Sequence, residues 1–379
     1  MEMRILRIIT RLNIGGPALQ AISLTKELSL KGHNCTLFTG FSSDDEGYEL
    51  EKEAFYIIPH RTYWFRALQR EINLRKDFWM FKVIRNELKH GNYDILHTHM
   101  SKAGFLGRLA ALSIPKKNRL KIVHTFHGHT FHSYFGWLKS FAFRRIEIFL
   151  AKRSDVIIAI SKGQREELID YGIPSHKIKI IPLGFDLSEF LKIRKFEYDK
   201  DKILRIGFVG RLAPIKNLEL FVEVVEKLYE HFAIEIVIAG DGSKEEKEKL
   251  LPLRGLIIEQ HWFERKEMSD FYRMVDMVIC TSKNEGTPVG LIEAMAAGKL
   301  VMSTPVGGVK DLIGRGARGI YIYEDMLNLT INRLKILLED NAYKDLIRDA
   351  REYVKKNHKL ENLVNSIESL YLDLMNEKG

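Results

Sequence analysis

Two glutamates, Glu285 and Glu293, stand eight residues apart just after an apolar run at 276–282. The run has the length and composition of a buried strand, so both carboxylates are expected after a strand end. Two carboxylates would repel a phosphate group, but a carboxylate is a strong acceptor of hydrogen bonds from hydroxyl groups. The pair therefore predicts contact with a polyhydroxylated ligand, such as a sugar or a ribose.

The backbone between these glutamates offers a second kind of contact. Gly286 and Pro288 break the chain, and a helix is expected from Val289 until Gly298, because glycine commonly takes a left-handed conformation after a helix. The first N–H groups of a helix have no partner within it, and the helix dipole adds roughly half a positive charge there. We therefore expect the segment from Gly286 through Thr287 to Val289 to hold phosphate oxygens or sugar hydroxyls.

Two cations follow another expected strand, at 204–209. Arg211 comes directly after Gly210, and Lys216 lies five residues further along. Arginine presents a rigid fork of donors and lysine a mobile point charge, and both suit the negative charge of a diphosphate. The alternative is two exposed cations without a ligand.

Histidines gather where two expected strands end. His97 and His99 alternate along one extended segment and so share a face, and His127 follows the strand expected at 121–125. Ligands of open α/β sheets bind at the carboxyl ends of the strands, which makes His127 the catalytic candidate of the first half of the chain. We expect no metal site here, because a pair of histidines lacks the further ligands that a metal requires.

Gly15 and Gly16 form a turn between the first expected strand, at 4–9, and a helix expected over 18–31. A nicotinamide-binding fingerprint requires three glycines spaced G-x-G-x-x-G, so this pair does not predict a dehydrogenase. A tight turn that needs two glycines is the simplest interpretation of the pair.

Five stretches, in the same order along the chain, carry a resemblance to a known family. They are NIGGPALQ at 13–20, HTFHGH at 124–129, GFVGRLAPIKN at 207–217, IVIAGDG at 236–242 and EGTPVGLIEAMAAG at 285–298. The chain resembles the retaining glycosyltransferases of family 4, which use a sugar nucleotide. These enzymes have the GT-B fold, an α/β fold with two Rossmann-like domains that face a central cleft. The resemblance spans nearly the whole chain.

The resemblance also implies roles for single residues. The catalytic residues that it implies are His127, Arg211, Lys216 and Glu285. The donor-binding residues that it implies are Gly15, Gly16, Gly210, Gly286, Thr287, Pro288, Val289 and Glu293. In these roles the two cations neutralise the diphosphate while the glycosidic bond breaks, Glu293 accepts from the ribose, and Glu285 and His127 contact the transferred sugar.

The expected mechanism needs no cofactor besides the nucleotide-sugar donor. No fixed carboxylate nucleophile is evident, so we expect attack on the front face, with the leaving phosphate oxygen taking the proton of the acceptor. No Asp-x-Asp motif follows an expected strand, and a metal is therefore not implied. Closure of the domains around the substrates is expected.

A chain of 379 residues is long enough for two domains with separate cores. We expect an acceptor-side domain at 1–186, a charged linker at 187–202 and a nucleotide-sugar domain at 203–357. The family resemblance implies that the last helix, at about 358–379, crosses back onto the first domain.

The composition, 45% apolar and 29% charged, is that of a soluble globular protein. No run of about 18 apolar residues predicts a membrane span, and the N-terminus resembles a first strand and not a signal peptide. Cys35 and Cys280 lie in apolar runs and are expected as buried thiols, which fits a reducing cytoplasm.

The net charge of +9 suggests an anionic partner. No nucleic-acid-binding motif is present, so no nucleic acid is expected. The segment 60–89 has eight cations, three carboxylates and interleaved Trp and Phe residues, which is typical of a helix on an anionic membrane surface. The alternative is an ordinary amphipathic helix whose aromatic residues lie in the core. We expect a cytoplasmic protein, with peripheral binding to the inner face of the cell membrane as a hypothesis.

Together these features predict a retaining glycosyltransferase. It would move a hexose or N-acetylhexosamine from a nucleotide-diphosphate sugar, with UDP as the expected nucleotide, to a glycan or lipid-linked acceptor in cell-surface polysaccharide biosynthesis. Two alternatives remain open at this point. A nucleotide-sugar epimerase of the same fold would turn over the free donor without an acceptor, and a non-enzymatic basic binding protein would bind no nucleotide sugar.

Overall fold

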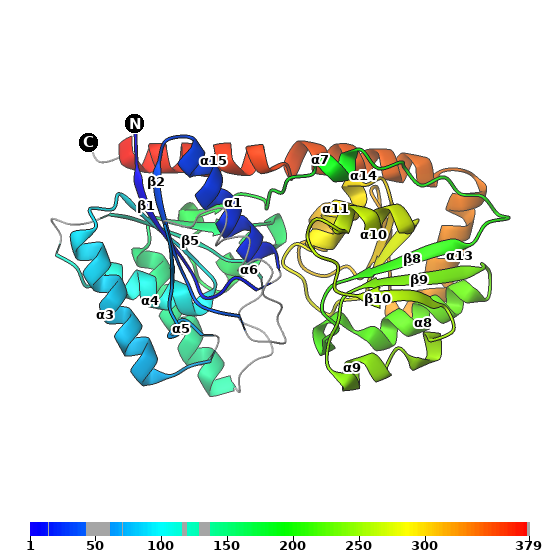
Figure 1. Cartoon of the computed structure of the whole chain (residues 1–379), viewed down its shortest axis with the longest axis horizontal. Helices are drawn as coiled ribbons and strands as arrows, with labels where there is room; N and C mark the ends of the chain where they lie inside the picture. The colour runs from blue at the N-terminus through cyan, green and yellow to red at the C-terminus, as the bar shows by residue number, and fades with distance from the viewer. Residues whose placement is uncertain (14, 43–60, 70, 116–119, 129–136, 377–379) are drawn as a thin grey trace. The chain divides into compact units, whose positions relative to one another are not determined.

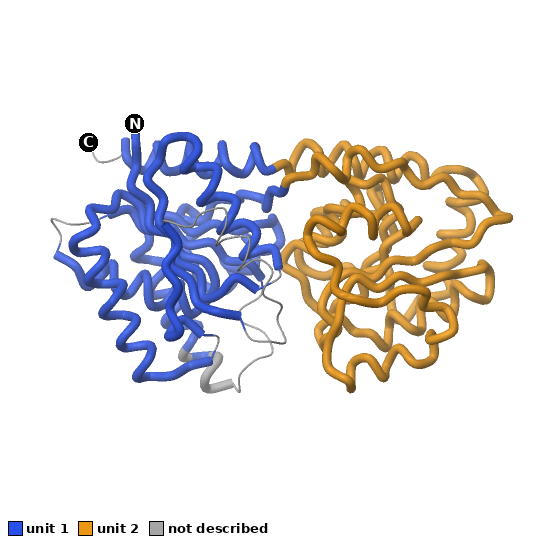
Figure 2. Tube along the Cα trace, in the orientation of Figure 1, with its two compact units in different colours: residues 1–185, 360–379 blue, residues 186–359 orange. Residues whose placement is uncertain are grey.

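The computed structural model of the chain describes residues 1–13, 15–42, 61–69, 71–115, 120–128 and 137–376. The chain divides into two compact units (Figure 2). Unit 1 comprises Met1–Phe185 and Leu360–Gly379, and unit 2 comprises Asp186–Lys359. Each unit has its own parallel sheet, covered by helices on both faces (Figure 1). The predicted α/β class with two Rossmann-like halves is confirmed.

The sheet of unit 1 has the strand order β3-β2-β1-β4-β5-β6-β7, and its paired strands are parallel. The strands are β1 (Arg4–Ile9), β2 (Asn34–Thr39), β3 (Thr62–Trp64), β4 (Ile95–His99), β5 (Lys121–Thr125), β6 (Val156–Ala159) and β7 (Ile178–Ile180). The chain adds strands on one side of β1 and then returns to add β4 on the other side. The order therefore reverses between β1 and β4, and in open α/β sheets such a point is where ligands bind.

The helices of unit 1 cover the two faces of this sheet. They are α1 (Gly16–Leu30), α3 (Leu74–His90), α4 (Ser101–Leu112), α5 (Trp137–Arg153), α6 (Lys162–Asp170) and α15 (Leu360–Asn376). One hydrophobic core joins α1 and α15 to the sheet residues Ile5, Ile95 and Val123. A second core joins α3 and α4 to the opposite face. The strands therefore carry apolar side chains on both faces, as buried parallel strands do.

The sheet of unit 2 has the order β10-β9-β8-β11-β12-β13 and is again parallel. Its strands are β8 (Leu204–Val209), β9 (Ile234–Ala239), β10 (Ile257–His261), β11 (Met277–Cys280), β12 (Leu300–Ser303) and β13 (Ile320–Tyr321). Its helices are α7 (Ser188–Leu191), α8 (Leu218–Tyr229), α9 (Lys244–Glu248), α10 (Met268–Met274), α11 (Val289–Ala296), α12 (Val309–Ile313), α13 (Leu327–Glu339) and α14 (Tyr343–Asn357). The strand order reverses between β8 and β11, so unit 2 has a second candidate ligand edge.

Two expectations differ from the structure. The segment 60–89 is not one helix, because Thr62–Trp64 adds β3 to the sheet and α3 begins only at Leu74. The expected linker at 187–202 belongs to unit 2, where Phe190, Ile193 and Phe196 are buried. The segment has many charged residues, so its composition indicated an exposed linker and did not predict that these three side chains are buried.

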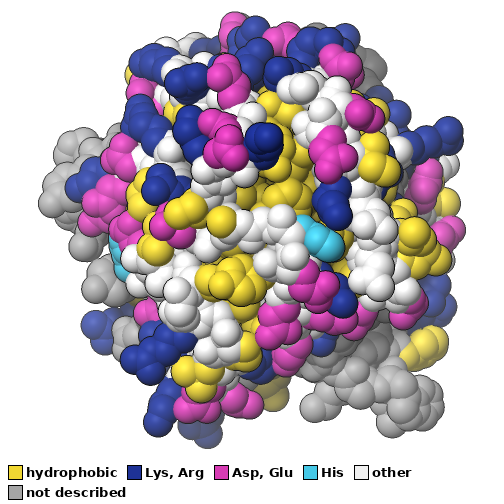
Figure 3. All heavy atoms as spheres, turned by 90° about the vertical axis from the view of Figure 1, so that its right-hand side faces the viewer, with side chains coloured by type: hydrophobic (Ala, Val, Ile, Leu, Met, Phe, Trp, Pro, Cys, Tyr) yellow, Lys and Arg dark blue, Asp and Glu magenta, His cyan; other side chains and the backbone are white. Residues whose placement is uncertain are grey.

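On the face of unit 2 seen in Figure 3, Lys and Arg side chains are interspersed with Asp and Glu. Mixed signs of this kind keep the local potential low, because neighbouring opposite charges cancel at a distance. The positive net charge of the chain is therefore not gathered on this face.

Candidate functional site

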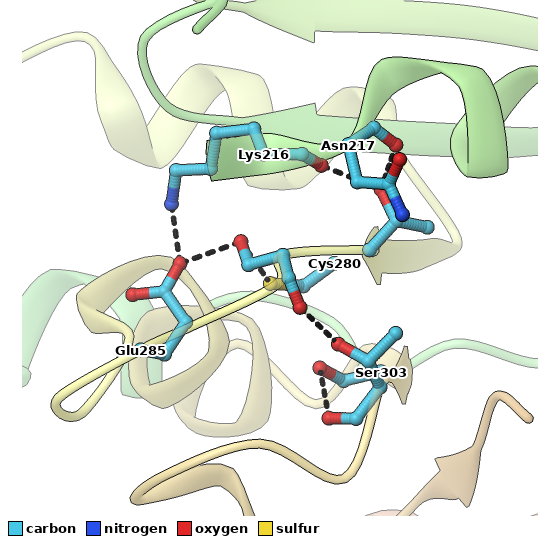
Figure 4. A network of polar contacts seen from close by, with 8 residues as sticks. Lys216, Asn217, Cys280, Glu285 and Ser303 are labelled. Atoms are coloured by element: carbon cyan, nitrogen blue, oxygen red, sulfur yellow. Dashed lines mark hydrogen bonds and ion pairs between the residues drawn. The ribbon is translucent and has the colours of Figure 1, made fainter. Parts of the chain in front are cut away.

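The predicted donor residues of unit 2 meet at its reversal point. β8 pairs with β11, so the loops that follow the two strands lie side by side. The first loop carries Lys216 and the second Glu285, and the Nζ atom of Lys216 lies 2.5 Å from Oε1 of Glu285 (Figure 4). The sequence predicted both residues at the donor, but it gave no sign that they form an ion pair.

The Lys216–Glu285 pair is largely enclosed by the protein. The side chains are 20% and 15% exposed, and Ser282 Oγ donates a further hydrogen bond of 2.7 Å to the same carboxylate oxygen. Burial alone would lower the pKa of Lys216, but nearby groups, with the Glu285 carboxylate foremost, together raise the pKa above its usual value. Lys216 therefore stays charged at neutral pH, as contact with a phosphate requires.

Hydrogen bonds join the loop that follows β8 to the loop that follows β11. Thr281 Oγ1 donates to the carbonyl oxygens of Lys216 and Asn217 at 2.9 and 3.1 Å. Gly210, at the end of β8, has φ +131°, and a Cβ atom there would lie 3.1 Å from Cε of Lys216. Glycine therefore serves two needs at this position, since it allows the left-handed backbone and leaves room for the lysine stem.

Arg211 follows Gly210 and is half-buried. Its charge opposes protonation of Lys216, which places the two cations within electrostatic range of each other. Glu285 offsets part of the repulsion between these two cations, and a further anion beside them would offset more of it. The arrangement suits the diphosphate that the sequence predicted for this loop.

The predicted helix after Glu285 is confirmed as α11, which begins at Val289. Gly298, with φ +68°, follows its C-cap as expected. Pro288 is the N-cap residue and provides no side-chain cap, so the N–H groups of the first turn have no partner in the cap side chain. Thr287 Oγ1 is also buried without a hydrogen-bond partner in the part of the chain that the structure describes. Leu291 and Ile292 N–H donate to the Pro288 carbonyl oxygen, so the helix start leaves the N–H groups before them and the Thr287 hydroxyl for a ligand.

Glu293 lies one helical turn inside α11 and is only 2% exposed. Arg265 donates to Oε1 of Glu293, and the Tyr272 hydroxyl lies 3.1 Å from Oε2. Both carboxylate oxygens therefore contact protein groups, and the predicted contact with a ribose stays a prediction. Arg265 and Tyr272 did not stand out in the sequence, because nothing near them in the chain indicates a buried carboxylate on another helix.

The reversal point of unit 1 holds histidines on β4, on β5 and just after β5. Nδ1 of His99 lies 2.8 Å from Nε2 of His127, and the ring centroids of His97 and His99 are 4.2 Å apart. These three rings share one face, whereas His124 lies on the other face, where Nδ1 lies 2.8 Å from Thr98 Oγ1. The prediction selected His127, but it did not foresee that His99 is its hydrogen-bond partner.

These histidines are neutral at physiological pH. Burial lowers the pKa of His97, His99 and His124 well below the usual value, and burial lowers the pKa of His127 to about 3. A neutral imidazole has one donor and one acceptor nitrogen. Within the described residues, Nε2 of His99 and Nδ1 of His127 are buried nitrogens without a hydrogen-bond partner. The pair can therefore contact groups that both donate and accept, such as hydroxyls.

The other predicted positions of unit 1 are less defined. Gly15 is the N-cap of α1, and a Cβ atom there would make only ordinary contacts with Asn13 and Pro17. Gly16 is the first residue of α1. Packing against the protein therefore does not require glycine at Gly15, and its role at the donor stays a prediction.

The described ranges contain neither a cluster of metal ligands nor a membrane-spanning helix. Among these residues, no group of three or more His, Cys, Asp or Glu side chains could hold a metal ion. None of the helices there combines the length and the hydropathy that a membrane span requires.

Comparisons with known proteins agree with the two-unit architecture. Residues 14–189 match the family model described as Glycosyltransferase Family 4, and residues 189–360 match Glycosyl transferases group 1. The chain is 28% identical over 336 residues to the UDP-Gal:alpha-D-GlcNAc-diphosphoundecaprenol alpha-1,3-galactosyltransferase of Escherichia coli. That alignment covers 84% of this chain and 85% of the relative.

Two solved structures have the same fold over nearly their whole length. The sucrose-phosphate synthase of Thermosynechococcus elongatus has a TM-score of 0.78 at 18% identity, with 99% of this chain and 100% of that chain covered. HepE of Anabaena, in complex with UDP, has a TM-score of 0.76 at 18% identity, with 98% and 100% covered. At these identities the two structures show the fold alone.

Proposed function

The chain belongs to the glycosyltransferases of the GT-B fold, with a Family 4 half and a group 1 half, and we propose that it is a retaining hexosyltransferase with a UDP-sugar donor. The E. coli relative is named for a UDP-linked galactose donor, and HepE was solved with UDP. These names support UDP as the nucleotide and a hexose or N-acetylhexosamine as the transferred sugar.

The observation that carries this proposal is the Lys216–Glu285 pair at the reversal point of unit 2. A lysine that is held charged beside a helix start matches a diphosphate, because both features stabilise negative charge. The adjacent carboxylate can accept from a sugar hydroxyl on the other side of the phosphates. One small cluster thus provides a contact for each half of a nucleotide-sugar linkage.

The proposed reaction needs no covalent intermediate on the protein. A hydroxyl oxygen of the acceptor attacks the anomeric carbon while the bond from that carbon to the phosphate oxygen breaks. The hydroxyl proton passes to the leaving phosphate oxygen, so UDP departs from the face that the acceptor enters and configuration is retained. Arg211 and Lys216 stabilise the charge that grows on the diphosphate, and His127 contacts the transferred sugar as a neutral hydrogen-bonding group.

A thermal-shift titration followed by a turnover assay tests this function. UDP should raise the melting temperature, since a ligand at 100 times its dissociation constant stabilises the folded state by about 2.7 kcal/mol. UDP-galactose, UDP-glucose and UDP-N-acetylglucosamine would then be incubated with a synthetic lipid-diphosphate N-acetylglucosamine, and UDP release would be measured. No shift with UDP, GDP or ADP would contradict the donor site.

A nucleotide-sugar epimerase is not favoured, because the matched families are transferases. The same assay without an acceptor distinguishes the two activities. Conversion of the free UDP-sugar to its epimer would support the epimerase, whereas UDP release that depends on the acceptor supports the transferase.

We further propose a lipid-linked acceptor at an anionic membrane surface, based on the exposed residues of α3 and α5. α3 turns Met80, Ile84 and Leu88 into the core. Large apolar side chains that nevertheless stay exposed on the two helices are Leu74, Phe78, Trp79, Phe141, Ile146 and Phe149. Cations lie over two of these rings, with Lys82 Nζ 4.6 Å from the Phe78 centroid and Arg153 Cζ 3.8 Å from that of Phe149.

Such a mixture of rings and cations suits an anionic bilayer, where each Lys or Arg contributes about 1 kcal/mol. Sedimentation with phosphatidylglycerol vesicles should show binding that falls with salt, and phosphatidylcholine vesicles should bind little. The double variant Phe78→Ala/Trp79→Ala should weaken this binding. Tyr229→Ala, which removes an exposed ring from unit 2, serves as the matched control. Absence of binding under all conditions would favour a soluble acceptor.

A further inference from the structure

Arg7 of β1 and Tyr371 of α15 are both fully buried and begin a chain of polar contacts inside unit 1. Arg7 Nη1 donates to Thr25 Oγ1 at 2.8 Å, and Nη2 donates to the Tyr371 hydroxyl at 3.2 Å. The Thr25 hydroxyl in turn donates a hydrogen bond of 2.7 Å to the carbonyl oxygen of Ala21. The guanidinium therefore holds the Tyr371 hydroxyl in place from the opposite end of the chain.

The Arg7 guanidinium favours one direction for these hydrogen bonds. Because an arginine can only donate, the Tyr371 hydroxyl accepts from Arg7, and the arrangement that also uses the hydroxyl hydrogen has Tyr371 donating to His97 Nδ1, 2.5 Å away. The hydrogen of the neutral His97 ring then lies on Nε2, which donates to Thr125 Oγ1 at 2.7 Å. Burial and the charge of Arg7 lower the pKa of His97, so the ring stays neutral, and its two hydrogen-bond partners then select the tautomer.

The fixed ring of His97 touches the next histidine of the same strand. The centroids of His97 and His99 are 4.2 Å apart with the planes tilted by 31°. His99 Nδ1 in turn lies 2.8 Å from His127 Nε2. The first ring is thus held by two hydrogen bonds, the second packs on the first, and the third is hydrogen-bonded to the second.

We propose that Tyr371 is a positioning residue for His127 and acts through His97 and His99. This inference rests on the proposed function, because it takes His127 as a residue of the transfer site. His127 follows β5 and is not part of the strand, so its ring depends on the partner of its nitrogen for orientation. A small displacement of a catalytic group lowers turnover strongly, whereas donor binding by unit 2 does not require this ring.

Tyr371→Phe tests the proposal, because it removes only the hydroxyl. We expect kcat for UDP release from the best of the three UDP-sugars to fall about 10-fold or more, while KM for the donor changes by less than about twofold. Thr125→Val, which removes the partner at the other ring nitrogen of His97, should change kcat in the same direction. Ile367→Val is the matched control, since it trims a fully buried residue of the same helix without touching the hydroxyl.

Nitrogen NMR of ring-labelled histidine provides a readout that does not depend on activity. The wild-type protein should show one histidine fixed with its hydrogen on Nε2, and Tyr371→Phe should shift that signal towards a mixture of tautomers. Unchanged signals and unchanged kcat in Tyr371→Phe would overturn the proposal. An equal loss of kcat in Ile367→Val would also overturn it, because the helix would then act through stability alone. If the wild-type protein turned over no UDP-sugar, the proposed function would fail, and the NMR comparison would still decide whether Tyr371 orders the histidines.

Discussion

Lys216→Ala should weaken UDP binding by more than the loss of one cation, because it leaves the Glu285 carboxylate without its partner beside the phosphates. The two side chains are 2.5 Å apart and only 20% and 15% exposed. At about 4 Å and an effective dielectric constant of about 20, a single charge pair has an upper bound of about 4 kcal/mol. Hydrogen bonds to charged groups contribute about 1.5–3 kcal/mol net. We therefore expect a loss of about 2–3 kcal/mol, which is roughly 30- to 150-fold in affinity.

A double-mutant cycle separates two effects of Lys216→Ala: the lost attraction between Lys216 and the phosphates, and the new repulsion between the phosphates and the unpaired Glu285 carboxylate. UDP titration calorimetry would compare the wild type with Lys216→Ala, Glu285→Gln and the double variant. The double variant should bind UDP more tightly than Lys216→Ala, with a coupling energy within the range of about 0.5–3 kcal/mol found for residues in contact. Turnover should fall on the order of 100-fold in Lys216→Ala and should not recover in the double variant, because the preorganised cation is still missing.

Lys283→Ala is the control for this cycle, since it removes an exposed cation from the same loop. Its UDP affinity should stay close to that of the wild type. If the effects of Lys216→Ala and Glu285→Gln simply add, the carboxylate does not lie beside the phosphates. If Lys283→Ala reproduces the loss, the effect comes from net charge and not from the pair.

Acidification should destabilise the protein. Burial lowers the folded-state pKa of the histidines on β4 and β5 below the unfolded value of about 6.5, so the unfolded chain binds more protons as pH falls. Urea unfolding at pH 7.5 and 5.5 should show a loss on the order of 1 kcal/mol per histidine for each pH unit below 6.5, and a flat profile would contradict these pKa values. Glu293→Gln should lower the free energy of unfolding by about 1–3 kcal/mol, because Arg265 loses a charged acceptor. The same substitution should raise KM for the donor. A loss of stability with a normal KM would show that Glu293 has a purely structural role. Arg211→Ala should lower turnover on the order of 100-fold, and the thermal shift with UDP should persist in EDTA. Loss of that shift in EDTA would refute a metal-free donor site.

The alternation of apolar runs and turns was sufficient to predict most sheet strands of both units, because a buried parallel strand is apolar on both faces. Two short edge strands were missed. Thr62–Trp64 is a three-residue edge strand inside a basic, aromatic segment, and Ile320–Tyr321 has only two residues. Runs of this length have no measurable periodicity, so only pairing with a neighbouring strand defines them.

In the site too, features set by neighbouring residues could be predicted, whereas contacts between residues far apart in the sequence could not. The N-terminus of α11 and the glycine after it could be predicted, because local backbone rules determine them. The Lys216–Glu285 pair joins residues that are 69 positions apart, and the Arg265–Glu293 pair joins residues 28 positions apart. A single sequence gives the type of each residue but not which residues meet, so the partners appeared only in the fold.

The two reversal points share an architecture but differ in electrostatics. In unit 2 the strand ends carry Arg211 and Lys216, and the raised pKa of Lys216 keeps this cation charged at neutral pH, which suits a diphosphate with its growing negative charge. In unit 1 the corresponding edge carries imidazoles that burial keeps neutral. A fixed charge there would favour binding of an ion, whereas neutral rings can donate to one hydroxyl and accept from another. The burial of His99 and the partial burial of His127 therefore suit contact with sugar hydroxyls, and under our proposal the orientation of these rings depends on a residue as deep in the fold as Tyr371.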